Sequence, residues 1–150
     1  MQVKDIMTRD PACCTPDTNL QEVARLMVEH DCGGIPVVDD RQSMRPVGIV
    51  TDRDICCRTV AEGKNPLEMT AGDCMSSPCV TVTPEMSVED CCQVMEENKI
   101  RRVPVVDERG TCWGSWPRPT SRDTPRSRRR PKSLKRSRGP QDRVRARVNR

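Results

Sequence analysis

Ten cysteines and a single histidine are the residues of this sequence whose chemistry could support metal binding or nucleophilic catalysis. No two cysteines have the C-x-x-C spacing of a zinc site, and His30 has no partner at a ligand spacing. A catalytic thiol needs a base beside it, and a lone histidine at the end of a predicted helix is more typical of a solvated terminus. The sequence therefore predicts no catalytic residue and no metal site. Six of the cysteines form adjacent doublets in which Val, Ala or Ile would fit equally well, which indicates buried reduced thiols: Cys13 with Cys14, Cys56 with Cys57, and Cys91 with Cys92.

The elements that would position any functional residue must come from a short chain. Its 150 residues and 17.0 kDa allow one ordinary domain or two very small ones, and exclude a large multidomain enzyme. Phe and Tyr are absent, so the core must be built from aliphatic residues, Met and Cys. No apolar run is long enough to span a bilayer, and the N-terminus lacks the pattern of a signal peptide, so we expect a cytoplasmic protein without a membrane segment.

The charge of the chain is divided unevenly. Residues 1–112 carry 12 basic against 20 acidic side chains, whereas residues 113–150 carry 14 against 2. The overall net charge of +4 therefore averages an acidic body of −8 with a basic tail of +12. The two parts call for separate interpretations.

The acidic body contains a tandem duplication. Residues 3–40 align without a gap onto residues 71–108 at a constant offset of 68. The identities fall at turns and strands, where the backbone geometry is demanding. The matched motifs are Asp5-x-Met7 with Asp73-x-Met75, Thr15-Pro16 with Thr83-Pro84, Met27-x-Glu29 with Met95-x-Glu97, and the PVVD segments at 36–39 and 104–107.

Each repeat predicts the element order β-α-β-β-α, which is an α/β fold. A short apolar run and a Thr-Pro turn precede a helix whose apolar residues recur at helical spacing. In the first repeat, Thr18 with Gln21 predicts a capping box at the start of that helix, and the glycines at 33–34 predict its end. Buried strands are expected over 35–38 and 47–51, and a second helix over 52–63. The helical stripes are Leu20, Val23, Ala24 and Met27 in the first repeat, and Val88, Cys91, Cys92 and Met95 in the second.

The segments KDIM, GIPVVD, GIVTDRDI and RRVPVVD, together with the repeated Thr-Pro turns, resemble the cystathionine-β-synthase-type (CBS) domain. Two such repeats resemble a CBS pair, or Bateman module, and are similar to small stand-alone bacterial CBS-pair proteins. We expect repeat 1 over residues 1–63, a linker over 64–70, a truncated repeat 2 over 71–112 and a disordered basic tail over 113–150. The resemblance implies a regulatory, ligand-sensing module that is not an enzyme, requires no cofactor and forms a homodimer. It also implies that AMP, ADP, ATP or S-adenosylmethionine binds between the repeats and changes their arrangement.

Thr51 and Asp54 are the first candidates for contacts with such an adenosine-containing ligand. They lie where a predicted strand meets a helix, so the Thr hydroxyl and free backbone N–H groups can meet phosphate while the carboxylate accepts both ribose hydroxyls. The same two residues also suit a purely structural role as a helix cap. Ile35 and Pro36 offer an apolar wall for adenine, or are simply core residues of a strand.

Arg101 and Arg102 are the best basic candidates in an otherwise acidic body. They replace Gly33 and Gly34 of the first repeat. The resemblance implies that a basic residue at this point reaches a phosphate across the cleft, and a planar guanidinium suits phosphate bidentately. The alternative is that both are solvated surface cations.

The second repeat departs from the pattern after Cys112. A strand and helix like GIVTDRDI should follow, but the chain reads TCWGSWPRPTSR, which predicts the loss of a sheet strand, a helix and the second T-x-x-D motif. A new frame that starts at the third base of the Cys112 codon encodes Leu and Gly opposite Val47 and Gly48, and permits apolar residues opposite Ile49 and Val50. We therefore expect residues from about 113 onward to derive from a frameshift. The alternatives are a genuine tail that binds nucleic acid or anionic surfaces, and a non-functional product that exposes strand edges and aggregates.

Overall fold

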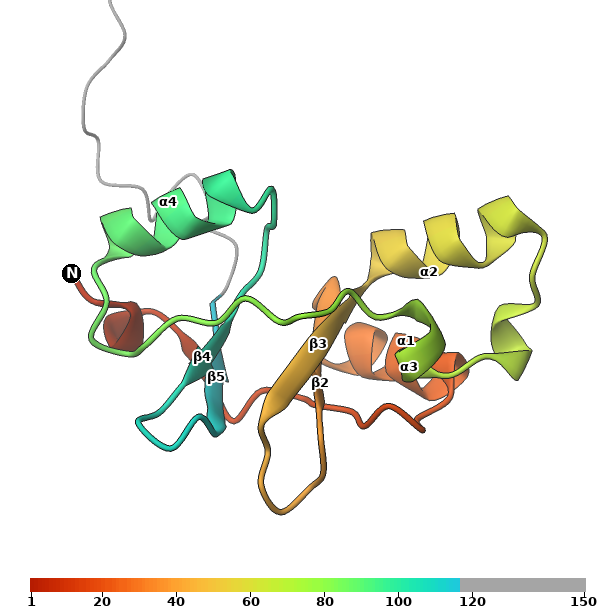
Figure 1. The fold of residues 1–150 in the computed structure, drawn as a ribbon, viewed down its shortest axis with the longest axis horizontal. Coiled ribbons are helices and arrows are strands. Elements are labelled where there is room, and N and C mark those ends of the chain that lie inside the picture. Colours follow the sequence, from red (N-terminus) through yellow and green to blue (C-terminus); the bar gives the residue numbers. More distant parts are fainter. Residues whose placement is uncertain (117–150) are drawn as a thin grey trace, which may run out of the picture. The chain divides into compact units, whose positions relative to one another are not determined.

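The computed structural model of the chain describes residues 1–116, which are drawn in colour in Figure 1. The disordered basic tail was predicted over residues 113–150. Its first four residues are described and are ordered, since β5 covers Cys112–Ser115 and Trp116 is buried, whereas residues 117–150 of the tail and of the segment assigned to a frameshift lie outside the described residues. No helix within residues 1–116 combines the length and the apolar character needed to cross a membrane.

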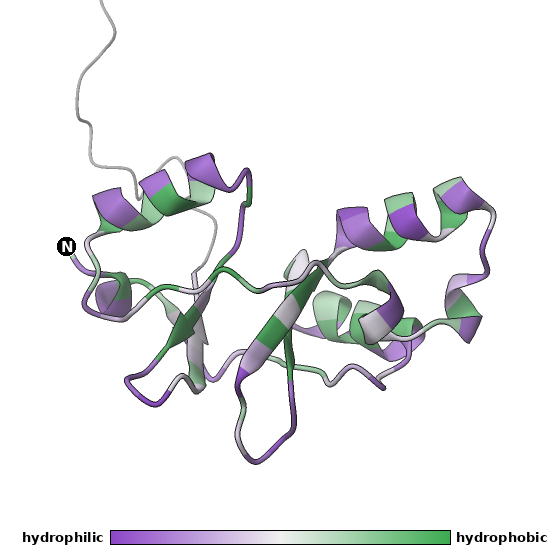
Figure 2. Cartoon of the chain, viewed as in Figure 1, coloured by the Kyte–Doolittle hydropathy of each residue, from purple (hydrophilic) through white to green (hydrophobic). Residues whose placement is uncertain are grey.

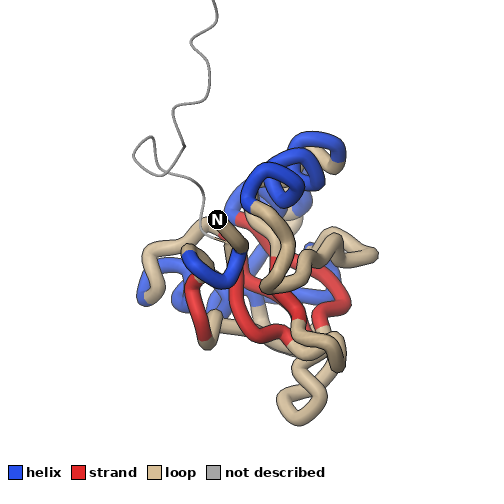
Figure 3. Tube along the Cα trace, turned by 90° about the vertical axis from the view of Figure 1, so that its left-hand side faces the viewer, coloured by secondary structure: helices blue, strands red, loops and turns tan. Residues whose placement is uncertain are grey.

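The fold mixes helices and strands in two similar repeats, which confirms the predicted fold class. In the first repeat, α1 (Leu20–Glu29) precedes the antiparallel strands β2 (Gly34–Val38) and β3 (Pro46–Thr51), and β3 leads into α2 (Asp52–Arg58). In the second, α4 (Val88–Glu97) precedes β4 (Pro104–Val106) and β5 (Cys112–Ser115). Figure 3 shows the strands lying between helical segments. The shorter elements are β1 (Thr8–Arg9), α3 (Ala71–Cys74) and three 3-10 helices, η1 (Val3–Asp5), η2 (Val60–Glu62) and η3 (Pro66–Glu68).

The ends of α1 differ from those that the sequence predicted. The cap is Asn19, whose side-chain oxygen accepts from the Glu22 N–H at 2.9 Å, because the Thr18 hydroxyl accepts instead from the Thr15 N–H at 3.1 Å and closes the Thr-Pro turn. The helix also ends earlier than predicted. His30 is its C-cap and Asp31 takes the left-handed conformation with φ 46°, so the two glycines at 33–34 follow the helix and lead into β2.

Each repeat has its own hydrophobic core, and the predicted helical stripes supply one side of each. Three of the four residues in each stripe are buried, whereas Ala24 and Cys92 are half-buried. The short apolar runs before the Thr-Pro turns are reduced to single parallel bridges, Cys14 to Val37 and Val82 to Val105. Figure 2 shows the corresponding alternation of hydrophobic and hydrophilic residues along α4. The buried stripe residues are Leu20, Val23 and Met27 in the first repeat, and Val88, Cys91 and Met95 in the second.

The first residues of the two repeats exchange places between the cores. Val3, at the start of the first repeat, is buried in the core of the second, and Ala71, at the start of the second repeat, is buried in the core of the first. Backbone hydrogen bonds fix both arrangements: the Val3 N–H donates to Met86 O at 3.0 Å, and the Leu20 N–H donates to Met69 O at 3.0 Å. Figure 1 accordingly shows the red N-terminal segment beside α4, and α3 beside α1. Each core is therefore completed by the first residues of the other repeat.

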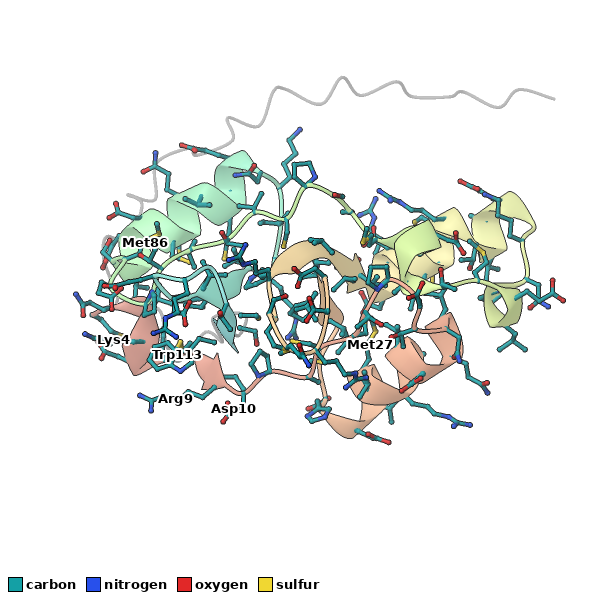
Figure 4. The ribbon with its side chains drawn as sticks, turned by 60° about the horizontal axis from the view of Figure 1, so that its bottom comes forward. Lys4, Arg9, Asp10, Met27, Met86 and Trp113 are labelled. Atoms are coloured by element: carbon teal, nitrogen blue, oxygen red, sulfur yellow. The ribbon has the colours of Figure 1, made fainter. Side chains whose placement is uncertain are left out.

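The strand that we expected the second repeat to lack is present in short form as β5. It pairs antiparallel with β4 on one side and with β1 on the other. The residues as written alternate in the way that a half-buried strand requires, since Cys112 and Gly114 are buried and Trp113 is exposed. Arg9 of β1 lies over the Trp113 ring, with 5.3 Å from the guanidinium carbon to the ring centroid (Figure 4). Departure from the sequence pattern therefore did not remove this strand.

Gly114 explains how β5 fits against the N-terminal segment. A Cβ at this position would stand 2.7 Å from the Met7 sulfur and 3.0 Å from the Thr8 carbonyl oxygen. Gly48 is in the same situation in the first repeat, where a Cβ would stand 2.7 Å from the Met75 sulfur. Both strands thus require glycine at their closest approach to the exchanged segments.

Candidate ligand-binding site

A cleft of about 710 Å³ lies between the two repeats. Four parts of the chain line it: Gly33 just before β2, the end of β3 with the start of α2, the segment 76–80 that follows α3, and the loop 98–102 that follows α4. The cleft combines apolar and charged side chains. Its walls come from both repeats, so a ligand that fills it contacts both.

Thr51 and Asp54 both line the cleft, and they also cap α2. The Thr51 hydroxyl accepts from the Asp54 N–H at 3.1 Å, while Asp54 Oδ2 accepts from the Thr51 N–H at 3.0 Å. Asp54 Oδ1 lies 4.0 Å from Arg58 Nε in the next helical turn. Thr51 and Asp54 therefore do cap α2, and Asp54 Oδ1 is the carboxylate oxygen that remains available to a ligand.

Arg101 and Arg102 line the cleft as well, on the side that the second repeat supplies. Arg101 is exposed and Arg102 is half-buried. Two further cations, Arg53 and Lys99, complete the basic lining, and the sequence reasoning missed both. Lys99 takes the left-handed conformation just after α4, with φ 55°. A charged residue directly after a predicted helix end is the feature of the sequence that could have indicated it.

The cleft cations have no acidic partner within the part of the chain that the structure describes. The ion pairs found there join Arg58 to Asp54 and Lys64 to Glu62, and neither involves a cation of the cleft. Against four cations, the lining holds two carboxylates, those of Asp52 and Asp54. The cleft is therefore electropositive within an acidic body, which favours an anionic ligand.

Ile35 and Pro36 lie elsewhere. Both are buried in β2, Ile35 with none of its surface exposed, and neither is among the residues that line the cleft. The apolar lining comes instead from four other residues, which the sequence reasoning did not select. Strand alternation offered a signal for one of them, since Ile49 lies between the buried Gly48 and Val50 and is half-buried. The four are Ile49, Pro78, Val80 and Ile100.

Four cysteines are buried as structural thiols, namely Cys14, Cys74, Cys91 and Cys112. The prediction of buried thiols is wrong for Cys56 and Cys57, which are exposed because α2 buries none of its residues. Burial raises the pKa of Cys14 to about 12, and it raises the pKa values of Cys79 and Cys91 to about 11. A hydrogen bond between Cys13 and Cys112 lowers the pKa of Cys13 and raises that of Cys112. Within residues 1–116, no group of three or more His, Cys, Asp or Glu side chains is placed to hold a metal ion.

The family model of the CBS domain matches residues 3–58 and 71–115. This chain belongs to the CBS-domain family. The CBS pair is 42% identical over 106 residues to the CBS domain-containing protein YhcV of Bacillus subtilis, which covers 71% of this chain and 73% of YhcV. It is also 36% identical over 114 residues to an uncharacterised protein of Methanopyrus kandleri. The match covers 76% of this chain but only 57% of the Methanopyrus kandleri protein.

Solved CBS-pair structures share the fold of this CBS pair. CBSX2 of Arabidopsis thaliana in complex with AMP matches with a TM-score of 0.65 at 28% identity, over 78% of this chain and 90% of CBSX2. The CBS domain pair of protein MJ0100, in complex with 5'-methylthioadenosine and S-adenosyl-L-methionine, matches with a TM-score of 0.69 at 28% identity, over 82% and 95% of the two chains. Both neighbours carry adenosine-containing ligands.

Proposed function

We propose that this CBS pair is a regulatory module that binds an adenosine-containing nucleotide in the cleft between its repeats. The observation that carries the proposal is the cleft itself, which joins an apolar lining to a carboxylate and to cations that have no acidic partner among residues 1–116. These are the three chemistries of a nucleotide's base, phosphates and ribose. The adenosine ligands of the two structural neighbours support the same assignment.

Each part of the nucleotide has a matching group. Ile49, Val80 and Ile100 provide the apolar contact for adenine, and the buried Pro36 of β2 pairs with Ile49 while its neighbour Ile35 pairs with Val50. Asp54 Oδ1 accepts the ribose hydroxyls, and the Thr51 hydroxyl with Arg101 and Arg102 receives phosphate. AMP, ADP, ATP and S-adenosylmethionine are the ligands to be compared.

The proposed output is a change of shape and no chemical reaction. A ligand in this cleft touches both repeats, so it favours the arrangement of repeats in which all its contacts are made. The first residues of each repeat are buried in the core of the other repeat, so a shift of one repeat moves residues in the core of the other. A regulatory role follows from this coupling.

Thermal unfolding with and without nucleotide tests the proposal. A nucleotide at about 100 times its Kd stabilises the folded state by about 2.7 kcal/mol, which raises the Tm by several degrees. Asp54→Asn keeps an oxygen that can cap the Thr51 N–H but removes the carboxylate, so it should retain the Tm of the free protein and lose the nucleotide-dependent rise. An unchanged Tm with AMP, ADP, ATP and S-adenosylmethionine would refute the proposal.

We also propose that the module acts as a homodimer, as its family resemblance implies. Helix α2 has no buried residue in the described chain, and two apolar side chains that follow it, Val60 and Leu67, are 66% and 64% exposed. Exposed apolar side chains of this kind suit contact with a second copy. Light scattering on the purified protein should give twice the mass of one 17.0 kDa chain, and a mass of one chain would contradict the proposal.

A further inference from the structure

The segments that follow α1 and α4 both turn at a left-handed residue, but they carry opposite charge. Asp31 and Lys99 occupy equivalent positions, and both are left-handed, with φ 46° and 55°. The loop 30–34 reads HDCGG and carries one negative charge, whereas the loop 98–102 reads NKIRR and carries three positive charges. The duplication therefore preserved the left-handed turn of this loop but placed the cations in the second repeat alone.

Gly34 and Arg102 occupy equivalent positions in the two loops, and they meet between the repeats. A Cβ on Gly34 would stand 3.0 Å from Arg102 Cδ, and 3.7 Å from the Thr51 methyl group. Gly34 also pairs with Thr51 in the β2–β3 register. The stem of Arg102 therefore crosses over the bare backbone of Gly34 and reaches the Thr51 side of the cleft.

Arg102 is half-buried and has no partner within residues 1–116. No hydrogen bond and no ion pair of its guanidinium is found there. A partly desolvated cation without a counter-charge is costly, and an anion in the cleft removes that cost. The same position in the first repeat is a glycine, and the charged residue of that loop, Asp31, would repel phosphate.

We propose that Gly34 is a positioning residue that lets Arg102 cross between the repeats, and that this crossing gives each chain one site for an anionic nucleotide. This inference rests on the proposed function and specifies its ligand charge and stoichiometry. The site is the cleft beside Thr51, because Arg102 brings its charge there. The related loop 30–34 offers no arginine to a second ligand.

A side chain at position 34 would affect ligand binding by displacing the Arg102 side chain. Because the contact is with a flexible side chain, alanine should displace the Arg102 stem only by a few tenths of an ångström. Valine adds two methyl groups in the same space and, being β-branched, suits the strand. Gly34→Val should therefore move Arg102 while β2 remains folded.

Isothermal titration with ADP and with adenosine tests the inference, because adenosine lacks the phosphates that Arg102 would bind. The wild-type protein should bind one ADP per chain. Arg102→Ala and Gly34→Val should each lower ADP affinity about tenfold or more and leave adenosine affinity within twofold. The double variant should be no weaker than Arg102→Ala alone, since both changes remove one interaction. Arg25→Ala, which removes an exposed arginine of α1, is the matched control and should bind ADP like the wild type.

The outcomes separate this inference from the proposed function. Two ADP molecules per chain, or ADP affinity that survives both Arg102→Ala and Gly34→Val, would overturn the inference and leave nucleotide binding intact. Loss of ADP and adenosine binding together in Gly34→Val would indicate a merely structural role for Gly34. If the wild-type protein binds neither ADP nor adenosine, the inference fails, and the Tm measured with AMP, ATP and S-adenosylmethionine then decides whether the proposed function fails with it.

Discussion

At the residue scale, Thr51 and Asp54 show how one pair of side chains serves both the helix and the cleft. The cap uses the Thr51 hydroxyl as an acceptor and Asp54 Oδ2, so the groups left for a ligand are the Thr51 O–H as a donor and Asp54 Oδ1 as an acceptor. Arg58 lies 4.0 Å from that oxygen, and it also donates to the Met75 carbonyl at 2.9 Å. A ribose that takes Oδ1 therefore competes with a residue that ties α2 to the segment after α3.

The buried thiols predict how stability depends on pH. The folded pKa values of Cys14, Cys79 and Cys91, at about 12, 11 and 11, lie above the ordinary value of 9.0. Folding therefore favours the protonated thiols, and their contribution is complete below pH 9 and declines as pH rises toward the folded values. We expect the free energy of unfolding to fall between about pH 9 and 11, by at most about 1.4 kcal/mol per pH unit for each of the three thiols. Urea unfolding at a series of pH values measures this slope.

Two cysteine variants isolate the thiol contribution. Cys79→Ala removes a titrating group whose pKa is raised by burial, so the alkaline slope should become shallower. Cys56→Ala changes an exposed cysteine and should leave the slope as it is. Equal slopes in the wild type and Cys79→Ala would show that this thiol does not contribute.

At the scale of the elements, the exchange of leading segments makes a prediction that the sequence order alone would not. Val3→Ala removes two methyl groups from the core of the second repeat and should lower the free energy of unfolding by about 2 kcal/mol. Hydrogen exchange should then accelerate first in α4, β4 and β5, with α1 less affected. Val28→Ala, at a position that is 82% exposed, should change stability by less than about 0.5 kcal/mol. Hydrogen exchange that accelerates in α1 before α4 would show that Val3 does not belong to the core of the second repeat.

Periodicity predicted α1, α4 and the strands of the first repeat, but not β1, α3, β5, the helix caps or the exchange of the first residues between the two cores. The stripe from Leu20 to Met27 and the strand over 35–38 follow directly from spacing. The cap of α1 depended on a local competition, in which Thr18 closes a turn and leaves Asn19 to accept from the helix. Nothing in the spacing of residues 1–9 shows which core they join, because the duplicated segments are compatible with either.

The candidate site was predictable to the same degree. Thr51, Asp54, Arg101 and Arg102 carry their chemistry in their residue types, and all four line the cleft. Its apolar lining was not predictable, because residues from three separate stretches meet only in the folded protein. Ile35 of β2 was a candidate because of its residue type, yet it is buried in the core of the first repeat. Ile49 on the neighbouring strand lines the cleft instead.

At the scale of the whole molecule, Trp116 bears on the origin of the C-terminal sequence. Gly114 pairs with Val105 as Gly48 pairs with Val37, so Trp116 stands where the first repeat has Val50. The Trp116 side chain is fully buried, and its indole N–H finds no hydrogen-bond acceptor within residues 1–116. A buried donor without an acceptor costs roughly 1–3 kcal/mol. The alternative frame encodes Leu, Met or Val at this place and avoids that cost.

This comparison predicts the outcome of resequencing codons 105–150 from fresh template. We expect one inserted or missing base near codon 112, because Gly at position 114 is encoded in both frames while the apolar residues that match Ile49 and Val50 are encoded only in the alternative one. Confirmation of the written frame would contradict the frameshift and make the basic segment, with 14 basic against 2 acidic residues, a translated part of the protein.

In that case the basic segment should bind RNA or DNA with an affinity that falls steeply with salt, since its phosphate contacts release counterions. Filter binding at 50 and 200 mM salt then decides whether the tail adds a second ligand to the CBS pair.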